Sequence, residues 1–224
     1  MAASDQNGSG TNDAHPPKTA DDWSARYRDH DTPWDVGEPY PELVRRLAME
    51  ELRPPAGGAH ALVPGAGYGH DALALARMGW RVTAIDFAAG ARDAAANELE
   101  SLGGRFLAVD ALAFGSSALG GDDADAGRYD LVFDHTFFCA IHPDQRPAWG
   151  AMVDRCLSQD GRLVCVVFPG GKSLDAGGPP WGTELEHQTE ALGPKFEVEL
   201  FEPCQRTLER RDWQENWGVF RRVH

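Results

Sequence analysis

The chain contains three alternate glycines followed by a carboxylate, and this pattern indicates its chemistry most directly. Gly65, Gly67 and Gly69 follow an apolar run, and Asp86 closes the next apolar run along the chain. Glycines let a backbone turn approach a ligand more closely than residues with side chains can. An acid at the end of the neighbouring strand can accept hydrogen bonds from both hydroxyl groups of a ribose. The spacing therefore predicts a nucleoside-binding site.

The residue at position 70 separates two kinds of nucleoside ligand. A dinucleotide-binding turn follows the pattern GxGxxG and uses its last glycine to pack the helix closely against the strand. This chain has His70 at that position, so its glycines follow the pattern GxGxG. A nicotinamide-dependent oxidoreductase is therefore a disfavoured alternative.

Strand-like apolar runs alternate with helix-like segments through most of the chain. We expect strands at 59–63, 82–85, 105–109, 129–133, 162–168, 196–202 and 217–223. We expect helices at 41–52, 71–78, 88–102 and 184–192, and a further one whose apolar face carries Trp149, Met152, Val153, Cys156 and Leu157. Repeated strand–helix–strand units require a mostly parallel sheet with helices on both faces. The prediction is a seven-stranded α/β fold that ends in an antiparallel hairpin.

The beginning of the chain has a different composition from the rest. Residues 1–20 are rich in Ser, Asn, Asp, Gly and Pro and have little apolar surface to bury, so we expect a disordered tail. Residues 21–224 are expected to form a single domain. Its first part, 21–55, is predicted to be a helical lid that carries Trp23, Tyr27 and Trp34.

The charge balance bears on partners and location. Thirty-five acidic residues against 21 Lys and Arg give a formal net charge of -14, and no cluster of basic residues suits a nucleic acid backbone. No apolar run is long enough to span a membrane, and no signal peptide is visible, so we expect a soluble cytoplasmic protein. The cysteines are widely scattered, which favours neither a metal site nor disulfides.

Further residues extend the nucleoside site into a family resemblance. The glycine turn, Asp86 and the triplet Val109, Asp110 and Ala111 together resemble the class I S-adenosylmethionine-dependent methyltransferases. Four blocks, "DTPWDVGEPYPEL", "LVPGAGYGHD", "FDHTFFCAIHPDQRPAW" and "GGPPW", are similar to the thiopurine methyltransferase family, especially its thiol and halide methyltransferase branch. The resemblance implies a Rossmann-like class I methyltransferase fold with S-adenosylmethionine as its cofactor.

The resemblance also implies which residues bind the cofactor. The aromatic rings of Trp23 and Trp34, and less directly that of Tyr27, would close over the positively charged sulfonium, which an aromatic face attracts. The remaining implied cofactor residues are Gly65, Gly67, Asp86, Asp110, Ala111 and His135. His135 departs from the branch, whose members commonly carry tyrosine at this position.

Methyl transfer to a thiol gains from a base or a nearby cation, because few thiols of ordinary pKa are ionised at neutral pH. The resemblance implies that Arg146 polarises the acceptor, although it could instead pair with Asp144 at the surface. His135 and His142 are the candidate bases, and either could instead be a solvated or capping loop residue.

Aromatic residues around the same blocks suggest a pocket for the acceptor. Phe138, Trp149 and Trp181, together with Phe137, would form apolar walls suited to a small soft acceptor, or else belong to the core. The hypothesis is an S-adenosylmethionine-dependent methyltransferase that acts on a small-molecule thiol by direct in-line displacement. The alternatives are a halide, metalloid or oxygen acceptor, and a non-catalytic protein that binds the cofactor.

Overall fold

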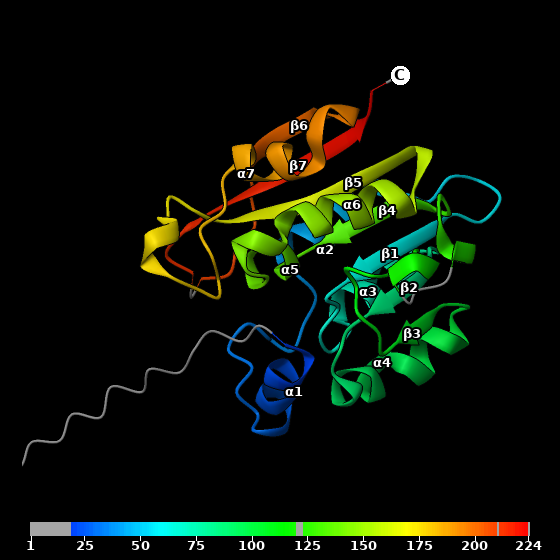
Figure 1. Ribbon diagram of the computed structural model, residues 1–224. Helices are drawn as coiled ribbons and strands as arrows, with labels where there is room; N and C mark the ends of the chain where they lie inside the picture. The colour runs from blue at the N-terminus through cyan, green and yellow to red at the C-terminus, as the bar shows by residue number, and fades with distance from the viewer. Residues whose placement is uncertain (1–18, 120–122, 210, 224) are drawn as a thin grey trace, which may run out of the picture.

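A seven-stranded sheet forms the centre of the molecule (Figure 1). The structure is a computed structural model that describes residues 19–119, 123–209 and 211–223. The strands lie in the order β3-β2-β1-β4-β5-β7-β6; β7 pairs antiparallel with β5 and β6, and the other neighbours pair in parallel. The strands are β1 His60–Pro64, β2 Arg81–Ile85, β3 Arg105–Leu107, β4 Tyr129–Asp134, β5 Leu157–Gly170, β6 Phe196–Pro203 and β7 Gln214–Arg222. The expected mostly parallel sheet with a C-terminal hairpin is confirmed.

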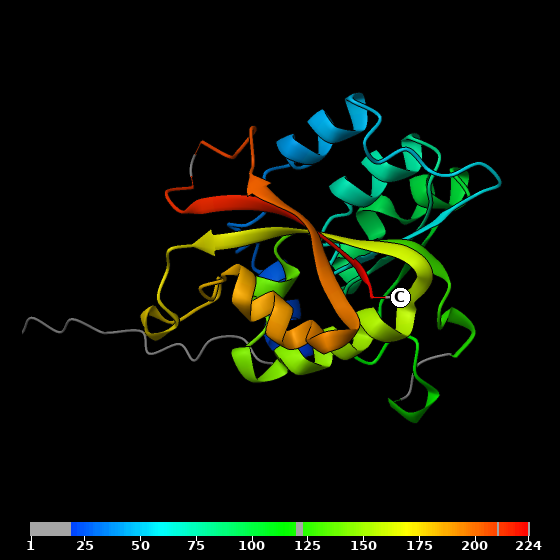
Figure 2. The same cartoon turned by 90° about the horizontal axis from the view of Figure 1, so that it is seen from above.

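Helices cover both faces of this sheet, as Figure 2 shows from above. One face carries α2 Pro41–Ala48, α3 His70–Arg77 and α4 Ala89–Ser101, and the other carries α6 Arg146–Cys156 and α7 Leu185–Leu192. Along β5, Val164 and Val166 pack toward the first group, whereas Leu163 and Cys165 pack toward the second. Because both faces are buried, the central strands are apolar on both sides, which is typical of a parallel sheet.

Four elements depart from the expected bounds by two residues or more, and one of them is β7, which begins at Gln214, three residues before the expected start. The helix that begins at Pro41 ends at Ala48, before Glu50, whose φ of 59° is incompatible with a continuing helix. β3 ends at Leu107, two residues before the expected end of its strand. Leu157, expected on a helix face, is instead the first residue of β5, where it pairs with Tyr129 of β4. Strand pairing outweighs the helical pattern at this position.

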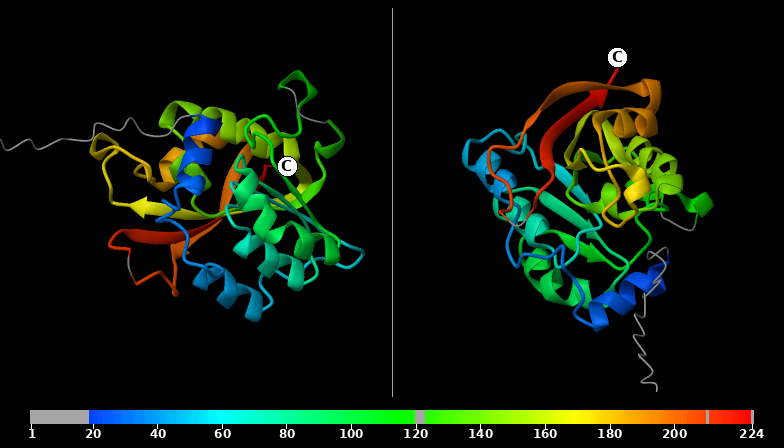
Figure 3. Two further views of the ribbon diagram at one scale, coloured as in Figure 1. Left: turned by 90° about the horizontal axis from the view of Figure 1, so that it is seen from below. Right: turned by 90° about the vertical axis from the view of Figure 1, so that its left-hand side faces the viewer.

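The part of the N-terminal lid before α2 lies at the opposite side of the molecule from the β6–β7 hairpin and packs against α4 (Figures 1 and 3). Its helix, α1 Ala20–Arg28, begins with a capping box in which Thr19 and Asp22 bond each other's backbone N–H groups. Most of the expected N-terminal tail, residues 1–18, lies outside the described residues, whereas Thr19 and Ala20 already belong to the start of α1. None of the helices in the described ranges is long and apolar enough to cross a membrane.

Candidate active site at the carboxyl ends of the parallel strands

The glycine turn joins β1 to α3 at the point where the strand order reverses. Gly65 has a φ of +60°, and a Cβ atom there would lie 2.4 Å from the ring of Phe137. Gly69 has a φ of +81°, and a Cβ atom there would lie 2.6 Å from the side chain of Ala95 in α4. Side chains at either position would be strained and would collide with these neighbours. The turn is therefore fixed between the segment that follows β4 on one side and α4 on the other.

Asp86 follows β2 and is bound to the backbone of the glycine turn. Its Oδ2 accepts the Gly67 N–H at 2.9 Å, and its Oδ1 accepts the Ala88 N–H at 3.0 Å. Burial raises the pKa of this carboxyl, while these backbone donors and the nearby Tyr27 hydroxyl lower it. These bonds fix the carboxylate at the carboxyl end of β2 beside the glycine turn, which is where folds of this kind bind the hydroxyl groups of a ribose.

The lid brings three aromatic rings to this turn. The ring centroids of Trp23 and Trp34 lie 5.4 Å apart, and those of Tyr27 and Trp34 lie 5.7 Å apart, both edge to face. Tyr27 also packs on Tyr68, which belongs to the glycine turn, with a centroid distance of 5.3 Å. The lid is therefore attached to the turn by aromatic contacts, and its rings surround a space above the turn.

The segment after β4 is organised by a buried carboxylate, Asp134. Its Oδ1 accepts the N–H groups of Phe137 and Phe138 at 3.1 and 3.2 Å, and its Oδ2 accepts the Trp149 indole N–H at 2.7 Å. Burial raises the pKa of Asp134 to about 6. These bonds hold Thr136 at a φ of 72° and start the four-residue helix α5, Phe137–Ala140, so that Phe137 packs against Gly65.

His135 uses both nitrogen atoms of its ring. Nδ1 lies 2.8 Å from Oδ2 of Asp71, and Nε2 lies 3.3 Å from the guanidinium of Arg211. Because a guanidinium can only donate, Nε2 accepts and the proton is on Nδ1, which donates to Asp71. Arg211 also contacts Glu215 at 2.5 Å. His135 therefore links α3 to the β6–β7 connection, and both of its ring nitrogens are engaged in these contacts.

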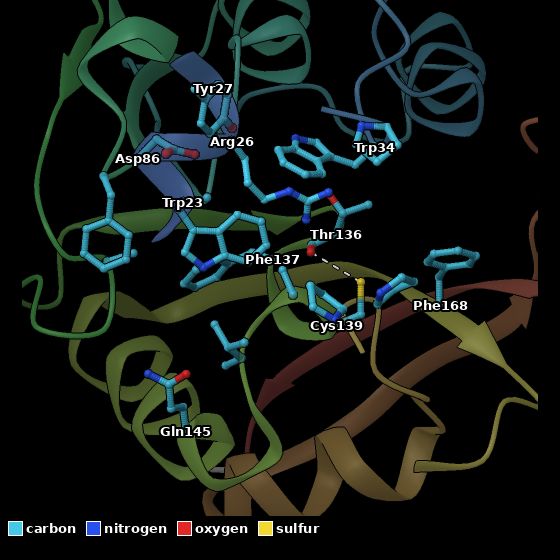
Figure 4. A pocket seen from close by; sticks show the side chains of 18 of the residues that line it. Trp23, Arg26, Tyr27, Trp34, Asp86, Thr136, Phe137, Cys139, Gln145 and Phe168 are labelled. Atoms are coloured by element: carbon cyan, nitrogen blue, oxygen red, sulfur yellow. Dashed lines mark hydrogen bonds between the residues drawn. The ribbon is translucent and has the colours of Figure 1, made fainter. Parts of the chain in front are cut away.

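These elements enclose a cavity of about 290 Å³. Figure 4 shows Tyr27 and Asp86 at one side of it and Phe168 at the other, with Arg26 extending between the lid tryptophans. Its walls come from the lid, the glycine turn, the ends of the parallel strands and the β6–β7 connection. They consist of Trp23, Arg26, Tyr27, Pro33, Trp34, Gly65, Asp86, Phe87, Ala111, Leu112, Thr136, Phe137, Cys139, Ala140, Ile141, Gln145, Phe168, Pro179, Pro180 and Arg211.

The structure brings most of the predicted cofactor residues to this cavity. Those that line it are Trp23, Trp34, Gly65, Asp86 and Ala111, together with Tyr27. Gly67 and His135 line a second, smaller hollow, which shares Trp34, Gly65 and Thr136 with the cavity. Asp110 is exposed, and its carboxylate accepts the N–H of Leu112, so this residue shapes the chain beside the cavity instead of lining it.

Apart from Phe137, the residues predicted to be catalytic or to form the acceptor pocket are not among those that line the cavity. His142 caps a short turn by accepting the Asp144 N–H, and its ring packs on Trp181. The guanidinium of Arg146 is buried, donates to the Gly182 carbonyl at 2.8 Å and lies over Phe138; burial lowers its pKa. It therefore does not form the surface pair with Asp144 that the sequence left open.

Two of the three predicted pocket residues, Phe138 and Trp149, are core residues, with 2% and 0% of their surface exposed. Trp181 follows Pro179 and Pro180, which line the cavity, but is not itself a lining residue; its backbone N–H donates to the Cys139 carbonyl at 2.7 Å. Cys139 lines the cavity. Burial raises the pKa of its thiol to about 12, so it is a neutral wall residue.

Sequence reasoning missed two charged residues that line the cavity, Arg26 and Arg211. Arg26 lies three residues after Trp23 and next to Tyr27 on the lid helix, so helical spacing could have placed it beside the cofactor aromatics. Arg211 lies far from every motif, and nothing in its local sequence indicates the cavity. Among the cavity-lining residues that the structure describes, the other charged side chain is Asp86.

The fold is that of a class I methyltransferase. The solved structure of the 1,6-didemethyltoxoflavin N1-methyltransferase of Burkholderia thailandensis superposes with a TM-score of 0.67 at 21% identity, covering 92% of this chain and 87% of that one. The glycine turn, the Asp86 carboxylate beside it and the aromatic lid fit S-adenosylmethionine, which is the cofactor.

The chain belongs to the thiopurine S-methyltransferase family, whose model matches residues 18–224. Among similar proteins, thiocyanate methyltransferase 1 of Arabidopsis thaliana is 30% identical over 208 residues, which is 90% of this chain and 85% of that protein. A protein named probable thiol methyltransferase 2, also from Arabidopsis thaliana, is 30% identical over 77% of this chain and 71% of its own. The chain is thus an S-adenosylmethionine-dependent methyltransferase.

Proposed function

We propose that this methyltransferase transfers the methyl group to a small thiol, which reacts as its thiolate. The observation that carries the proposal is the part of the cavity away from Asp86. Figure 4 shows Cys139 and Phe168 there, and the charged group beside them is the Arg211 guanidinium, which lies over the Phe168 ring. Apolar walls with one cation suit a small, polarizable anion, and the printed names of the relatives, thiocyanate and thiol methyltransferases, support the same chemistry.

Arg211 is held in place by its neighbours. Its guanidinium lies 4.3 Å from the centroid of the Phe168 ring, 2.5 Å from the Glu215 carboxylate and 3.3 Å from Nε2 of His135. Glu215 also accepts the Tyr40 hydroxyl at 3.0 Å, which fixes the carboxylate. The Glu215 carboxylate offsets part of the positive charge of Arg211. The remaining positive charge favours an acceptor that binds as an anion.

S-adenosylmethionine supplies an electrophilic methyl group on a positively charged sulfur. The residues of the chain position the acceptor, exclude water with the lid and lower the pKa of the acceptor thiol through Arg211. A thiol of pKa about 8.5 is only a few per cent ionised at pH 7, so a neighbouring cation raises the reactive fraction. The thiol proton leaves to solvent as the acceptor enters, and the proposal assigns no base role to His135 or His142.

The test is an acceptor panel of hydrosulfide, methanethiol, thiophenol, thiocyanate and iodide, with methylated product measured for the wild type and for Arg211→Met. We expect product from the thiols. Arg211→Met should raise KM for methanethiol about tenfold or more, because a charge-assisted contact is lost. Its dissociation constant for S-adenosylhomocysteine should stay within about twofold of the wild type, which also shows that the variant is folded.

Arg206→Met is the matched control, because Arg206 is exposed in the same β6–β7 connection and does not line the cavity. A wild-type chain that binds S-adenosylhomocysteine but methylates none of the thiols would overturn the proposed acceptor class. An unchanged KM in Arg211→Met would remove Arg211 from the acceptor site.

A further inference from the structure

Arg26 carries a positive charge from the lid helix into the cavity (Figure 4). The carbon at the centre of its guanidinium lies 4.5 Å from the Trp34 ring centroid and 5.8 Å from that of Trp23. Its Nε donates to the Asp31 carboxylate at 3.0 Å. The side chain is 23% exposed, whereas that of Asp31 is 62% exposed and faces solvent. The charge of Arg26 is therefore balanced from outside the cavity.

The cofactor brings its own charges to this space. Its amino-acid part ends in a carboxylate and an ammonium group, and its sulfur is positively charged. Of the charged residues that the structure describes around the cavity, Asp86 is bound to the glycine turn and Arg211 lies by Phe168. Arg26 is next to Tyr27 in the lid, whose hydroxyl lies 3.3 Å from where a Gly67 Cβ would be.

We propose that the Arg26 guanidinium binds the carboxylate of the cofactor's methionine part and thereby fastens the lid over the bound cofactor. This inference rests on S-adenosylmethionine binding in the cavity, and it does not depend on the identity of the acceptor.

The geometry of Arg26 suits this role. A guanidinium that stacks on an aromatic ring keeps the N–H groups at its edge available for hydrogen bonds. The pair with Asp31 uses Nε, so the two terminal nitrogens can meet a carboxylate with two parallel hydrogen bonds. Stacking between Trp23 and Trp34 restricts the side chain before the ligand arrives, which reduces the entropy lost on binding.

The same geometry argues against a direct contact between Arg26 and the sulfonium. Both groups are cations, and the face of Trp34 that could attract the sulfonium is partly covered by the guanidinium. A carboxylate that pairs with Arg26 removes this repulsion. Trp23 and Tyr27 then remain as the lid rings nearest the adenosyl part.

The test compares two neutral-sulfur ligands that differ in the amino-acid part. S-adenosylhomocysteine has the carboxylate, and 5′-methylthioadenosine lacks the whole amino-acid part. Dissociation constants are measured by calorimetry for the wild type, for Arg26→Met and for the control Arg28→Met, which changes an exposed arginine of the same helix. We expect Arg26→Met to weaken S-adenosylhomocysteine about tenfold or more and methylthioadenosine less than about twofold. Arg28→Met should leave both constants unchanged.

Retained affinity for methylthioadenosine also shows that the variant is folded. Equal losses for the two ligands would mean that Arg26 only packs the lid, and this result would overturn the proposal. Unchanged binding of S-adenosylhomocysteine would overturn it as well. A wild-type chain that binds neither ligand would contradict the cofactor site itself, a result distinct from failure of the thiol panel.

Discussion

At the scale of single residues, the partners of a side chain decide what it can do. Both histidines after β4 have the right residue type for a base, but the Nε2 lone pair of His135 accepts from Arg211, and Nδ1 of His142 accepts the Asp144 N–H. Arginines that carried no role in the sequence argument reach the cavity instead. The residue types suggested that the histidines act as bases, whereas their contacts give them structural roles and leave arginines as the cations at the cavity.

For His142, the base role expected from the sequence and the capping role seen in the structure predict different kinetics. If His142 acted as a base, it would be needed for methyl transfer to thiols and dispensable for transfer to iodide. Its position outside the cavity instead predicts that His142→Asn keeps turnover for methanethiol within about twofold of the wild type. Asparagine can still cap the turn, so the variant should fold normally. Initial rates with methanethiol and iodide measure this. A large loss confined to the thiol would restore the base role.

Asp134 predicts a pH dependence of stability. Its pKa is raised by burial to about 6, so the folded state binds its proton more tightly than the unfolded state does. The stabilisation is complete at pH values below the unfolded pKa and is lost as the pH rises through about 6. Relative to Asp134→Asn, the wild type should lose about 1 kcal/mol of unfolding free energy between pH 5 and pH 7.5.

Urea unfolding of both proteins at the two pH values measures this difference. The comparison depends on the change with pH, so any constant cost of the substitution, such as a weaker contact to Trp149, cancels. A difference between the two proteins that is the same at both pH values would mean that Asp134 does not titrate in this range.

At the scale of elements, the sequence predicted most of the fold and little of the cavity wall. The strand and helix periods placed β1, β2, β4 and both hairpin strands to within a few residues, because these are local patterns of burial. The short α5 was missed, since it depends on the bonds from Asp134 and has no periodicity of its own. The start of β5 was missed because pairing between Leu157 and Tyr129 decides it.

The third glycine of the turn gives a prediction at this scale. Gly69 and Gly103 have nearly the same φ, +81° and +80°, but a Cβ at Gly69 meets Ala95, whereas one at Gly103 meets nothing within 4 Å. Gly103→Ala should cost about 1–2 kcal/mol of backbone strain. Gly69→Ala should cost about 1–3 kcal/mol more, because α3 and α4 must separate.

Chemical unfolding of the two variants isolates the packing contribution, since the backbone strain is nearly matched. Equal losses of stability would show that contact between α3 and α4 plays no part in the need for glycine at position 69.

At the scale of the whole molecule, segments distant in sequence form one cavity. The lid contributes residues near position 26, the turn contributes Gly65, and the β6–β7 connection contributes Arg211. Motif spacing predicted the cofactor part, because the glycine turn and Asp86 are joined through adjacent strands. It could not predict the acceptor part, because the approach of Arg211 to Phe168 depends on where the whole hairpin packs.

The central claim is that this cavity holds the cofactor over the glycine turn. A crystal structure of the chain with S-adenosylhomocysteine tests it most directly. We expect the two ribose hydroxyl groups within hydrogen-bond distance of the Asp86 carboxylate, the adenine beside Ala111 and Leu112, and the lid rings closed over the ligand. An adenosyl group bound elsewhere, or a ribose with no contact to Asp86, would contradict the account.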